Sequence, residues 1–96
     1  DRAEKLAVQY SLSNIFDYTE ISEDTGIYEI PILDSWDNHS IMELNIRNKY
    51  KINILAIKKG DDVITLPPAD YVFDEGDHVL VLGKQRDMEK LLSKMK

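Results

Sequence analysis

The clearest indication of the fold is INILAIKKGDDVITL, at residues 52–66. Its first part, residues 52–57, is nearly continuous apolar sequence, which is typical of a buried central strand. Gly60-Asp61 then signals a turn, and residues 63–66 form the returning strand. Pro67-Pro68 ends this strand because neither proline has an N–H to donate to a neighbouring strand. The stretch therefore predicts a β-hairpin whose first strand is central.

Further strand patterns lie on both sides of the hairpin. The candidates are residues 18–21, 27–33 and 78–82, and residues 71–73 are expected to be short and extended. Pro31 cannot donate to a neighbouring strand, so its position inside a strand pattern predicts an edge strand or a bulge. Before the last strand, Glu75-Gly76-Asp77 is typical of a tight turn in which Gly76 takes a positive φ.

Helical patterns lie at both ends and in the centre. Apolar residues recur at helical spacing in two stretches, Ala3, Leu6, Ala7 and Tyr10, and Met88, Leu91, Leu92 and Met95. In the centre, Ser40 and Glu43 have the spacing of a capping box, which predicts a short helix from Ile41 to around residues 45–50. The patterns together predict an α+β domain. It has a small mixed or antiparallel sheet of about five short strands, a short central helix and helices at both ends.

Length and charge narrow the class of protein. The 96 residues allow one compact domain, at roughly 100–200 residues per domain. The chain carries 12 Lys and Arg against 18 Asp and Glu, a net charge of −6, which argues against nucleic-acid polymers and anionic lipid as partners. Residues 1–36 hold eight acids and two bases, whereas residues 37–96 hold ten of each. An anion site is therefore expected in the second part.

Two absences in the sequence exclude further classes. The chain has no cysteine, so disulfides and thiolate catalysis are excluded. No apolar run reaches the roughly 20 residues of a membrane span, so we expect no direct membrane insertion. The chain begins with Asp1 rather than Met, and we interpret it as a piece cut from a longer protein.

Few residues suggest catalysis or metal binding. His39 and His78 stand beside acids, but no second histidine lies at ligand spacing, so we interpret them as a loop residue and a strand-start residue. Asp61-Asp62 and the acids of residues 74–77 lie at predicted turns, and we interpret them as solvated; a divalent-cation site is the alternative. The sequence has neither a nucleophile motif nor a phosphate loop. We therefore predict no enzyme, no catalytic residue and no metal site.

Arg47 is the candidate for contact with an anionic ligand. It follows a short apolar helix turn and Asn45, and its guanidinium would present a planar fork to a phosphate. Ile41 and Met42, on the same short helix, would face a planar ring, and Asn53 would bond a base or a phosphate. From these residues alone, a core role for the apolar pair and a solvated arginine are the competing interpretation.

The order of these residues resembles the RCK-C (TrkA-C) domain. The resemblance is carried by SIMELNIR at residues 40–47, YKINILAIKKG at residues 50–60, Pro67, and EGDHVLVLG at residues 75–83. Residues 7–21 resemble the segment that enters this domain from the nucleotide-binding RCK-N domain in KtrA- and KtrC-type proteins. We expect residues 1–12 to be a connecting helix from a preceding domain, and residues 13–96 to be the ligand-binding domain.

The resemblance implies a cytoplasmic regulatory subunit of a bacterial potassium uptake system, bound to a separate membrane transporter subunit. It also implies a homodimer whose cleft binds cyclic di-AMP, which shuts transport. The family's ligand motif then falls on Ile41, Met42, Asn45, Arg47, Asn53, Pro67 and Pro68. In that motif the arginine contacts a phosphate, the apolar pair packs on adenine, and a proline lines the cleft.

Symmetry fits this expectation, because a two-fold dimer presents the same patch twice to a nucleotide with two equivalent halves. One Arg47 per chain then meets one phosphate. Asn45, Lys51 and Lys59 stand where the family often has an acidic residue, a glycine and an arginine, and these departures bear on adenine recognition. The alternatives are a ligand-free dimerisation module and a domain of another cation transporter that senses a different small ligand or a cation.

Overall fold

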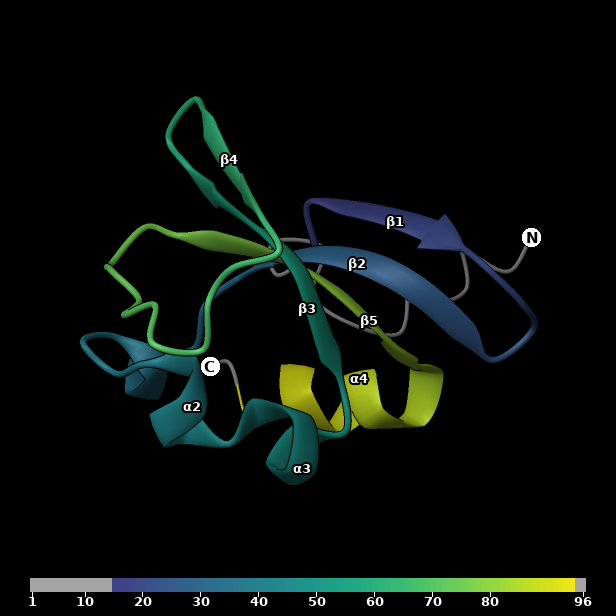
Figure 1. Cartoon of the computed structure of the whole chain (residues 1–96). Helices are drawn as coiled ribbons and strands as arrows, with labels where there is room; N and C mark the ends of the chain where they lie inside the picture. The colour runs from purple at the N-terminus through teal and green to yellow at the C-terminus, as the bar shows by residue number, and fades with distance from the viewer. Residues whose placement is uncertain (1–14, 95–96) are drawn as a thin grey trace.

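The predicted hairpin is part of a five-stranded sheet with the helices packed on one face (Figure 1). The computed structural model describes residues 15–94. The strands are β1 (Asp17–Glu20), β2 (Thr25–Pro31), β3 (Asn53–Lys59), β4 (Asp62–Thr65) and β5 (His78–Lys84). The helices are the 3-10 turn η2 (Asp34–Trp36), α2 (Ile41–Leu44), α3 (Ile46–Tyr50) and α4 (Gln85–Leu92). The predicted N-terminal helix and its boundary at residue 12 lie outside the described residues.

Strand order in the sheet is β1-β2-β5-β3-β4, and every neighbouring pair is antiparallel. The last strand of the chain, β5, therefore lies in the centre, where Val79 faces Ile30 of β2 and Ile57 of β3. The register of β3 against β5 shifts between Ile54 and Ala56. The predicted α+β class with five strands is confirmed.

The core lies between the inward face of the sheet and the helices. Val79 and Val81 of β5 are fully buried, and α4 contributes Met88, Leu91 and Leu92, the spacing that predicted this helix. Trp36 of η2 is also fully buried, and its ring centroid lies 5.4 Å from that of Phe73. No helix within residues 15–94 has the length and apolarity needed to cross a bilayer.

The central helix begins as predicted but is divided into two. Ser40 accepts from the Glu43 N–H at 3.0 Å, and the Glu43 carboxylate accepts from the Ser40 N–H at 3.2 Å, so the capping box is confirmed. Asn45 is left-handed, with φ 52°, and ends α2 before α3 begins at Ile46. Asn is among the few residues that adopt this conformation at low cost, which explains why the break falls here.

Residues 71–73 belong to no strand of the sheet; Val72 makes a single antiparallel bridge to Ser40, just before α2. The prediction for Pro31 is wrong. Pro31 is neither at an edge nor in a bulge. It is the last residue of the inner strand β2, opposite His78, where the ladder ends and the missing N–H costs nothing.

Candidate functional site

The start of α2 is joined to the segment that follows the Pro67-Pro68 pair. The Ile41 N–H donates to the Tyr71 carbonyl at 3.0 Å, and the Met42 N–H donates to the Ala69 carbonyl at 2.8 Å. These two N–H groups belong to the first turn of a helix, where they have no partner within the helix. Two parts of the predicted site that are far apart in the sequence are thus brought together.

The side chains at this junction differ in exposure. Met42 is 66% exposed, whereas Ile41 is half-buried against the core. Pro67 is half-buried and Pro68 is exposed. The two residues of the apolar pair therefore differ: Ile41 packs against the core, and the Met42 side chain is open to solvent.

Asn45, Arg47 and Asn53 extend the predicted site along α3 to the start of β3. All three are exposed. The Asn45 side-chain oxygen accepts from the Asn48 amide at 3.0 Å, so this amide is already used within the turn. The Arg47 side chain makes no hydrogen bond or ion pair with another residue of the described range 15–94. Its guanidinium is therefore available to an external acceptor.

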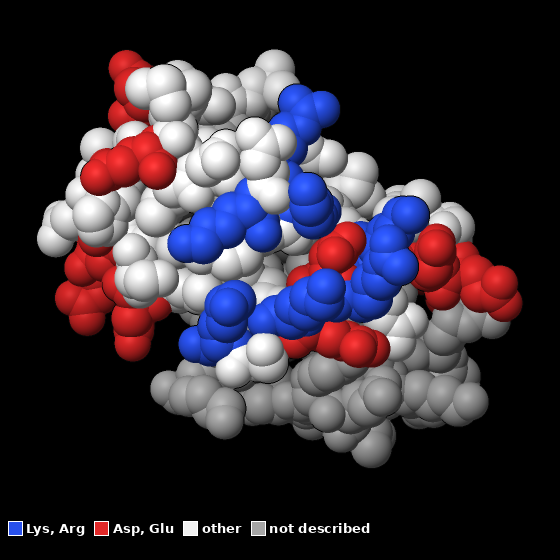
Figure 2. Space-filling view, turned by 90° about the horizontal axis from the view of Figure 1, so that it is seen from below, with Lys and Arg blue, Asp and Glu red and all other residues white. Residues whose placement is uncertain are grey.

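Arg47 belongs to a basic face formed by α3, α4 and their flanking residues. Figure 2, seen from the side of the helices, shows Lys and Arg side chains gathered in bands across this face, with a few acids among them. Among residues 15–94, Lys58 and Lys59 are held in ion pairs with carboxylates. The other seven cations of that range form no ion pair with it: Arg47, Lys49, Lys51, Lys84, Arg86, Lys90 and Lys94.

The acids before β5 are not all solvated, so that prediction is wrong for Asp77. Its side chain is 2% exposed and accepts from the Tyr71 hydroxyl at 2.7 Å, from Lys59 Nζ at 3.0 Å and from the Asp74 N–H at 2.9 Å. Burial alone raises the pKa of Asp77, but these hydrogen bonds outweigh it and hold the pKa below its ordinary value. In the sequence, Asp77 is visible only as part of the Asp-Glu-Gly-Asp turn, which is typical of solvated acids. Nothing in that turn indicates that Lys59, 18 residues earlier, pairs with Asp77.

The Asp77 cluster positions one half of the junction. The Tyr71 hydroxyl bonds to Asp77, while the Tyr71 carbonyl accepts from the Ile41 N–H. Lys59 bridges Asp77 and Asp74, at 3.0 and 2.7 Å, which anchors the end of β3 to the same turn. The segment that carries the two prolines is therefore fixed at its far end by a buried carboxylate.

The two histidines pair with carboxylates. His39 Nδ1 lies 2.9 Å from Glu43, and His78 Nδ1 lies 3.2 Å from Glu29, which also pairs with Lys58. No group of three or more His, Asp or Glu side chains within residues 15–94 is arranged to hold a metal ion. These pairs join neighbouring structural elements.

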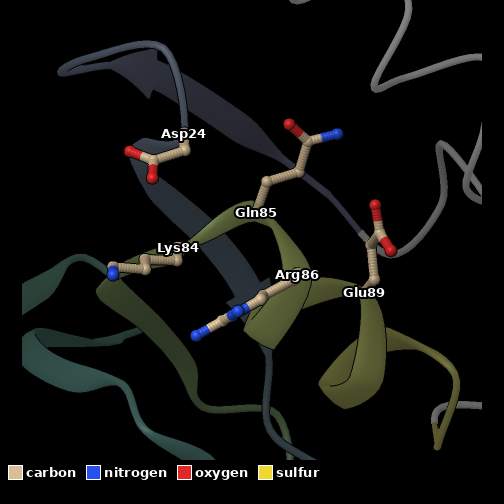
Figure 3. A pocket seen from close by; sticks show the side chains of 5 residues that line it. All are labelled: Asp24, Lys84, Gln85, Arg86 and Glu89. Carbon is tan, nitrogen blue, oxygen red and sulfur yellow. The ribbon is translucent and has the colours of Figure 1, made fainter.

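Two hollows lie away from the predicted site residues. One, of about 300 Å³, is lined by Asp24, Lys84, Gln85, Arg86 and Glu89; Figure 3 shows Lys84 and Arg86 extending to the same side, away from Glu89. The other, of about 510 Å³, includes the acids Asp34, Asp37, Glu75 and Asp77. Both contain carboxylates, and neither includes any of the seven predicted residues.

The chain is similar to proteins of potassium transport. It is 36% identical over 90 residues to the Ktr system potassium uptake protein C of Bacillus subtilis (strain 168), a match that covers 94% of this chain and 41% of that protein. The Ktr system potassium uptake protein A of the same strain is 31% identical over 90 residues, covering 94% of this chain and 40% of that protein. The chain thus spans about two fifths of these relatives.

Among solved structures, the chain resembles the RCK C domain of the potassium transport protein KtrA in complex with cyclic di-AMP. The TM-score is 0.67 at 26% identity, over 97% of this chain and 92% of that chain. The RCK_C domain dimer of S. agalactiae BusR, also in complex with cyclic di-AMP, has a TM-score of 0.64 at 26% identity, over 71% and 92% of the two chains. The pattern of the TrkA-C domain matches residues 27–96, and with these relatives it shows that the chain belongs to the TrkA-C (RCK-C) domain family.

Proposed function

We propose that this domain regulates a potassium transport system by binding cyclic di-AMP between two copies of itself. The observation that carries the proposal is the junction of α2 with the segment after Pro67-Pro68, where Met42 is exposed. Arg47, on the next helix α3, forms no ion pair with any of residues 15–94. The similarity to two RCK-C domains that are in complex with this nucleotide supports the choice of ligand.

The chemistry of the surface suits an anionic aromatic ligand. Arg47 provides a planar, permanently charged fork for a phosphate, and the adjoining basic face raises the local concentration of anions. Met42 provides a flexible apolar side chain that packs on a purine, and Asn53 provides an amide that donates and accepts. Asn45 ends α2 between Met42 and Arg47 in the sequence, and we include Pro67 and Pro68 as the apolar part of the cleft.

A second copy completes the proposed site. One chain supplies one Arg47, while the nucleotide has two phosphates, so a two-fold pair supplies one guanidinium to each. In a single copy such a site is an open surface rather than a cavity. This agrees with the seven proposed residues, none of which lines either of the two hollows described above.

Regulation would follow from a difference in affinity between two arrangements of the pair. A ligand shifts an equilibrium only by binding one arrangement more tightly than the other. We propose that the nucleotide-bound arrangement inhibits potassium uptake through a membrane transporter subunit, and that the domain works in the cytoplasm beside that subunit. The homology to Ktr uptake proteins supports this role.

Isothermal titration calorimetry with cyclic di-AMP tests the proposal. We expect one nucleotide per two chains and a higher melting temperature of the complex, since a ligand that binds only the folded state stabilises it. Arg47→Ala removes two phosphate contacts per nucleotide. At about 1.5–3 kcal/mol for each charge-assisted contact, the affinity should fall at least about 100-fold.

Arg86→Ala is the matched control, because Arg86 is also exposed on the basic face but lies on α4. Its affinity should stay near that of the unmodified chain. Unchanged affinity in Arg47→Ala would refute the assignment of the site. No binding and no thermal shift at saturating nucleotide would refute the ligand and leave a ligand-free dimerisation module.

A further inference from the structure

Lys84 and Arg86 stand at the beginning of α4, the end of a helix that disfavours positive charge. Lys84 is the N-cap residue, and its side chain makes no capping hydrogen bond. The N-cap is normally a Ser, Thr, Asp or Asn, and the N-terminal end of a helix carries a partial positive charge that repels cations. Asp87, in the first turn, offsets only part of this repulsion. The two cations therefore destabilise the start of α4.

The cations of α4 continue along one side of the helix. Arg86 and Lys90 are four residues apart, and Lys94 follows after four more, in the turn behind the helix. Residues at this spacing are neighbours on a helix surface, where two like charges destabilise the helix. All three side chains are exposed, and none forms an ion pair with any of residues 15–94. No carboxylate of that range relieves the repulsion along this row.

Lys51 adds a cation at the C-terminal end of α3. Its backbone is left-handed, with φ 63°, in a region that favours glycine and asparagine over lysine. The next residue, Ile52, lies against Gly83, which precedes Lys84. Lys51 and Lys84 are therefore at the same end of the sheet, beside the start of α4.

Five exposed cations thus lie on one side of the molecule, and we call them the basic stripe: Lys51, Lys84, Arg86, Lys90 and Lys94. Lys84 and Arg86 line the same hollow of about 300 Å³, and Figure 3 shows that both side chains extend to the same side. Asp24 and Glu89 also line this hollow, but neither forms an ion pair with its two cations. α3 and α4 pack against each other, and Figure 2 shows Lys and Arg gathered in bands over this side.

We infer that the basic stripe is the docking surface for an acidic segment, rich in Asp and Glu, of a partner protein. Cations at a helix start, like charges four residues apart and a left-handed lysine each lower the stability of the folded chain. Departures from local preference without a compensating contact are characteristic of functional surfaces. Carboxylates along the stripe supply that contact by charge complementarity, and they neutralise the repulsion between the cations.

The surroundings of the stripe favour a protein segment over a uniform polyanion. Asp87 and Glu89 stand among its cations, and the whole chain has a net charge of −6, so nucleic acid and anionic lipid are both repelled. The apolar residues of α4 are Met88, Leu91 and Leu92. All of them are buried in the core, so α4 has no apolar face to insert into a bilayer.

Fluorescence anisotropy with a labelled acidic peptide tests the inference. From Arg86 to Lys94 a helix rises about 12 Å, which about four residues of an extended segment span. The probe is a fluorescein-labelled peptide of about ten residues in which Glu alternates with Gly, which reaches beyond both ends of this row. We expect the whole chain to bind this Glu peptide, more weakly as the salt concentration rises. The same peptide with Gln in place of Glu should not bind.

Variants of the stripe separate docking from a structural role. Arg86→Gln combined with Lys90→Gln should weaken binding of the Glu peptide at least about fivefold. The melting temperature should stay the same or rise, because the repulsion between the two side chains is removed. Lys51→Gly should also weaken binding without a lower melting temperature, since glycine takes a φ of 63° without strain. A purely structural role would lower the melting temperature in these variants.

Lys49→Gln is the matched control for the loss of one charge. Lys49 is exposed on α3, but its ammonium lies over the Tyr50 ring, 5.5 Å from the ring centroid. It should weaken binding of the Glu peptide less than Lys90→Gln does. Equal losses in these two variants would show that only the net charge matters, which overturns the inference. The absence of binding overturns it as well, and so does tighter binding to duplex DNA or to phosphatidylglycerol vesicles.

The inference does not rest on cyclic di-AMP, because the seven residues proposed for the nucleotide are not part of the stripe. Calorimetry should therefore show that Arg86→Gln combined with Lys90→Gln keeps the affinity for cyclic di-AMP. Loss of that affinity would assign α4 to the nucleotide site and overturn the inference. Stripe-dependent binding of the Glu peptide by a chain that does not bind cyclic di-AMP supports the inference and refutes the proposed ligand.

Discussion

Lys59 Nζ donates a hydrogen bond to the buried carboxylate of Asp77 at 3.0 Å, and so joins the end of β3 to the turn before β5, 18 residues later. The same ammonium lies 2.7 Å from Asp74. Hydrogen bonds with these two carboxylates raise the pKa of Lys59 above its ordinary value. The pair closes the loop that carries Pro67 and Pro68, and it connects the stability of the sheet to the candidate site.

Asp77→Asn tests the contribution of this buried charge. The amide keeps the size of the side chain but loses the ion pair with Lys59 and presents an N–H₂ group where Asp77 only accepts. We expect a loss of about 1–3 kcal/mol in the free energy of unfolding, measured with urea. Asp61→Asn, at the exposed hairpin turn, is the control and should change it by less than about 0.5 kcal/mol. Equal effects would contradict the structural role of Asp77.

Stability should fall in acid because of two carboxylates. For Asp77 and for Glu29, burial raises the pKa, but hydrogen bonds outweigh it and hold both pKa values below their ordinary values. The unfolded chain, with values near about 3.9 and 4.3, then binds more protons than the folded chain. The stabilisation is fully present above about pH 5 and is lost as the pH falls through the lowered values.

Urea unfolding between neutral and acidic pH measures this dependence. Asp77→Asn should lose less stability than the unmodified chain as the pH falls below about 4, because one of the two groups no longer titrates. Parallel curves for the two proteins would show that Asp77 carries no such linkage.

Ser40→Ala removes the capping box and tests whether α2 supports ligand binding. The Ser40 hydroxyl accepts from the Glu43 N–H at 3.0 Å, and loss of such a cap costs about 0.5–2 kcal/mol. Because a weakened α2 no longer fixes the position of Met42, the affinity for cyclic di-AMP, measured by calorimetry, should fall as well. Ser35→Ala is the control, because Ser35 is an exposed residue of η2, a turn without a side-chain cap. A stable Ser40→Ala variant with full affinity would contradict the prediction.

Gly83→Ala tests the packing of β5 beneath the start of β3. A Cβ at this buried position would lie 2.9 Å from Ile52 Cγ2, which is too close. Overpacking of this kind costs about 1–3 kcal/mol, seen as a lower urea midpoint. Gly60→Asn, at the hairpin turn with φ 62° and open space around it, should cost less. A larger loss of stability in Gly60→Asn than in Gly83→Ala would show that backbone conformation outweighs packing at these two glycines.

Arg47→Lys separates charge from geometry at the proposed phosphate contact. Lysine keeps the positive charge but lacks the planar fork, so calorimetry should show an affinity for cyclic di-AMP between those of the unmodified chain and Arg47→Ala. The melting temperature without nucleotide should not change, because Arg47 is exposed. Full affinity in Arg47→Lys would show that charge alone is recognised.

Much of the fold was readable because its signals are local. The capping box at Ser40 and Glu43, the turns at Gly60 and Gly76, and the apolar spacing of α4 each depend on residues less than two helical turns apart. Pro31 was misread because a proline in a strand pattern does not show whether it lies within a ladder or at its last position.

The kinds of elements, their order and the family could be predicted from the sequence, since these follow from propensity, periodicity and residue order. The burial of Asp77 against Lys59, the bond of Met42 to Ala69 and the exposure of Leu66 could not, and they became visible only in the folded chain. Such contacts join residues far apart in the chain, and their free energy depends on which surfaces the packed sheet leaves open. The candidate site was named residue by residue from the sequence, but its shape arises from that packing.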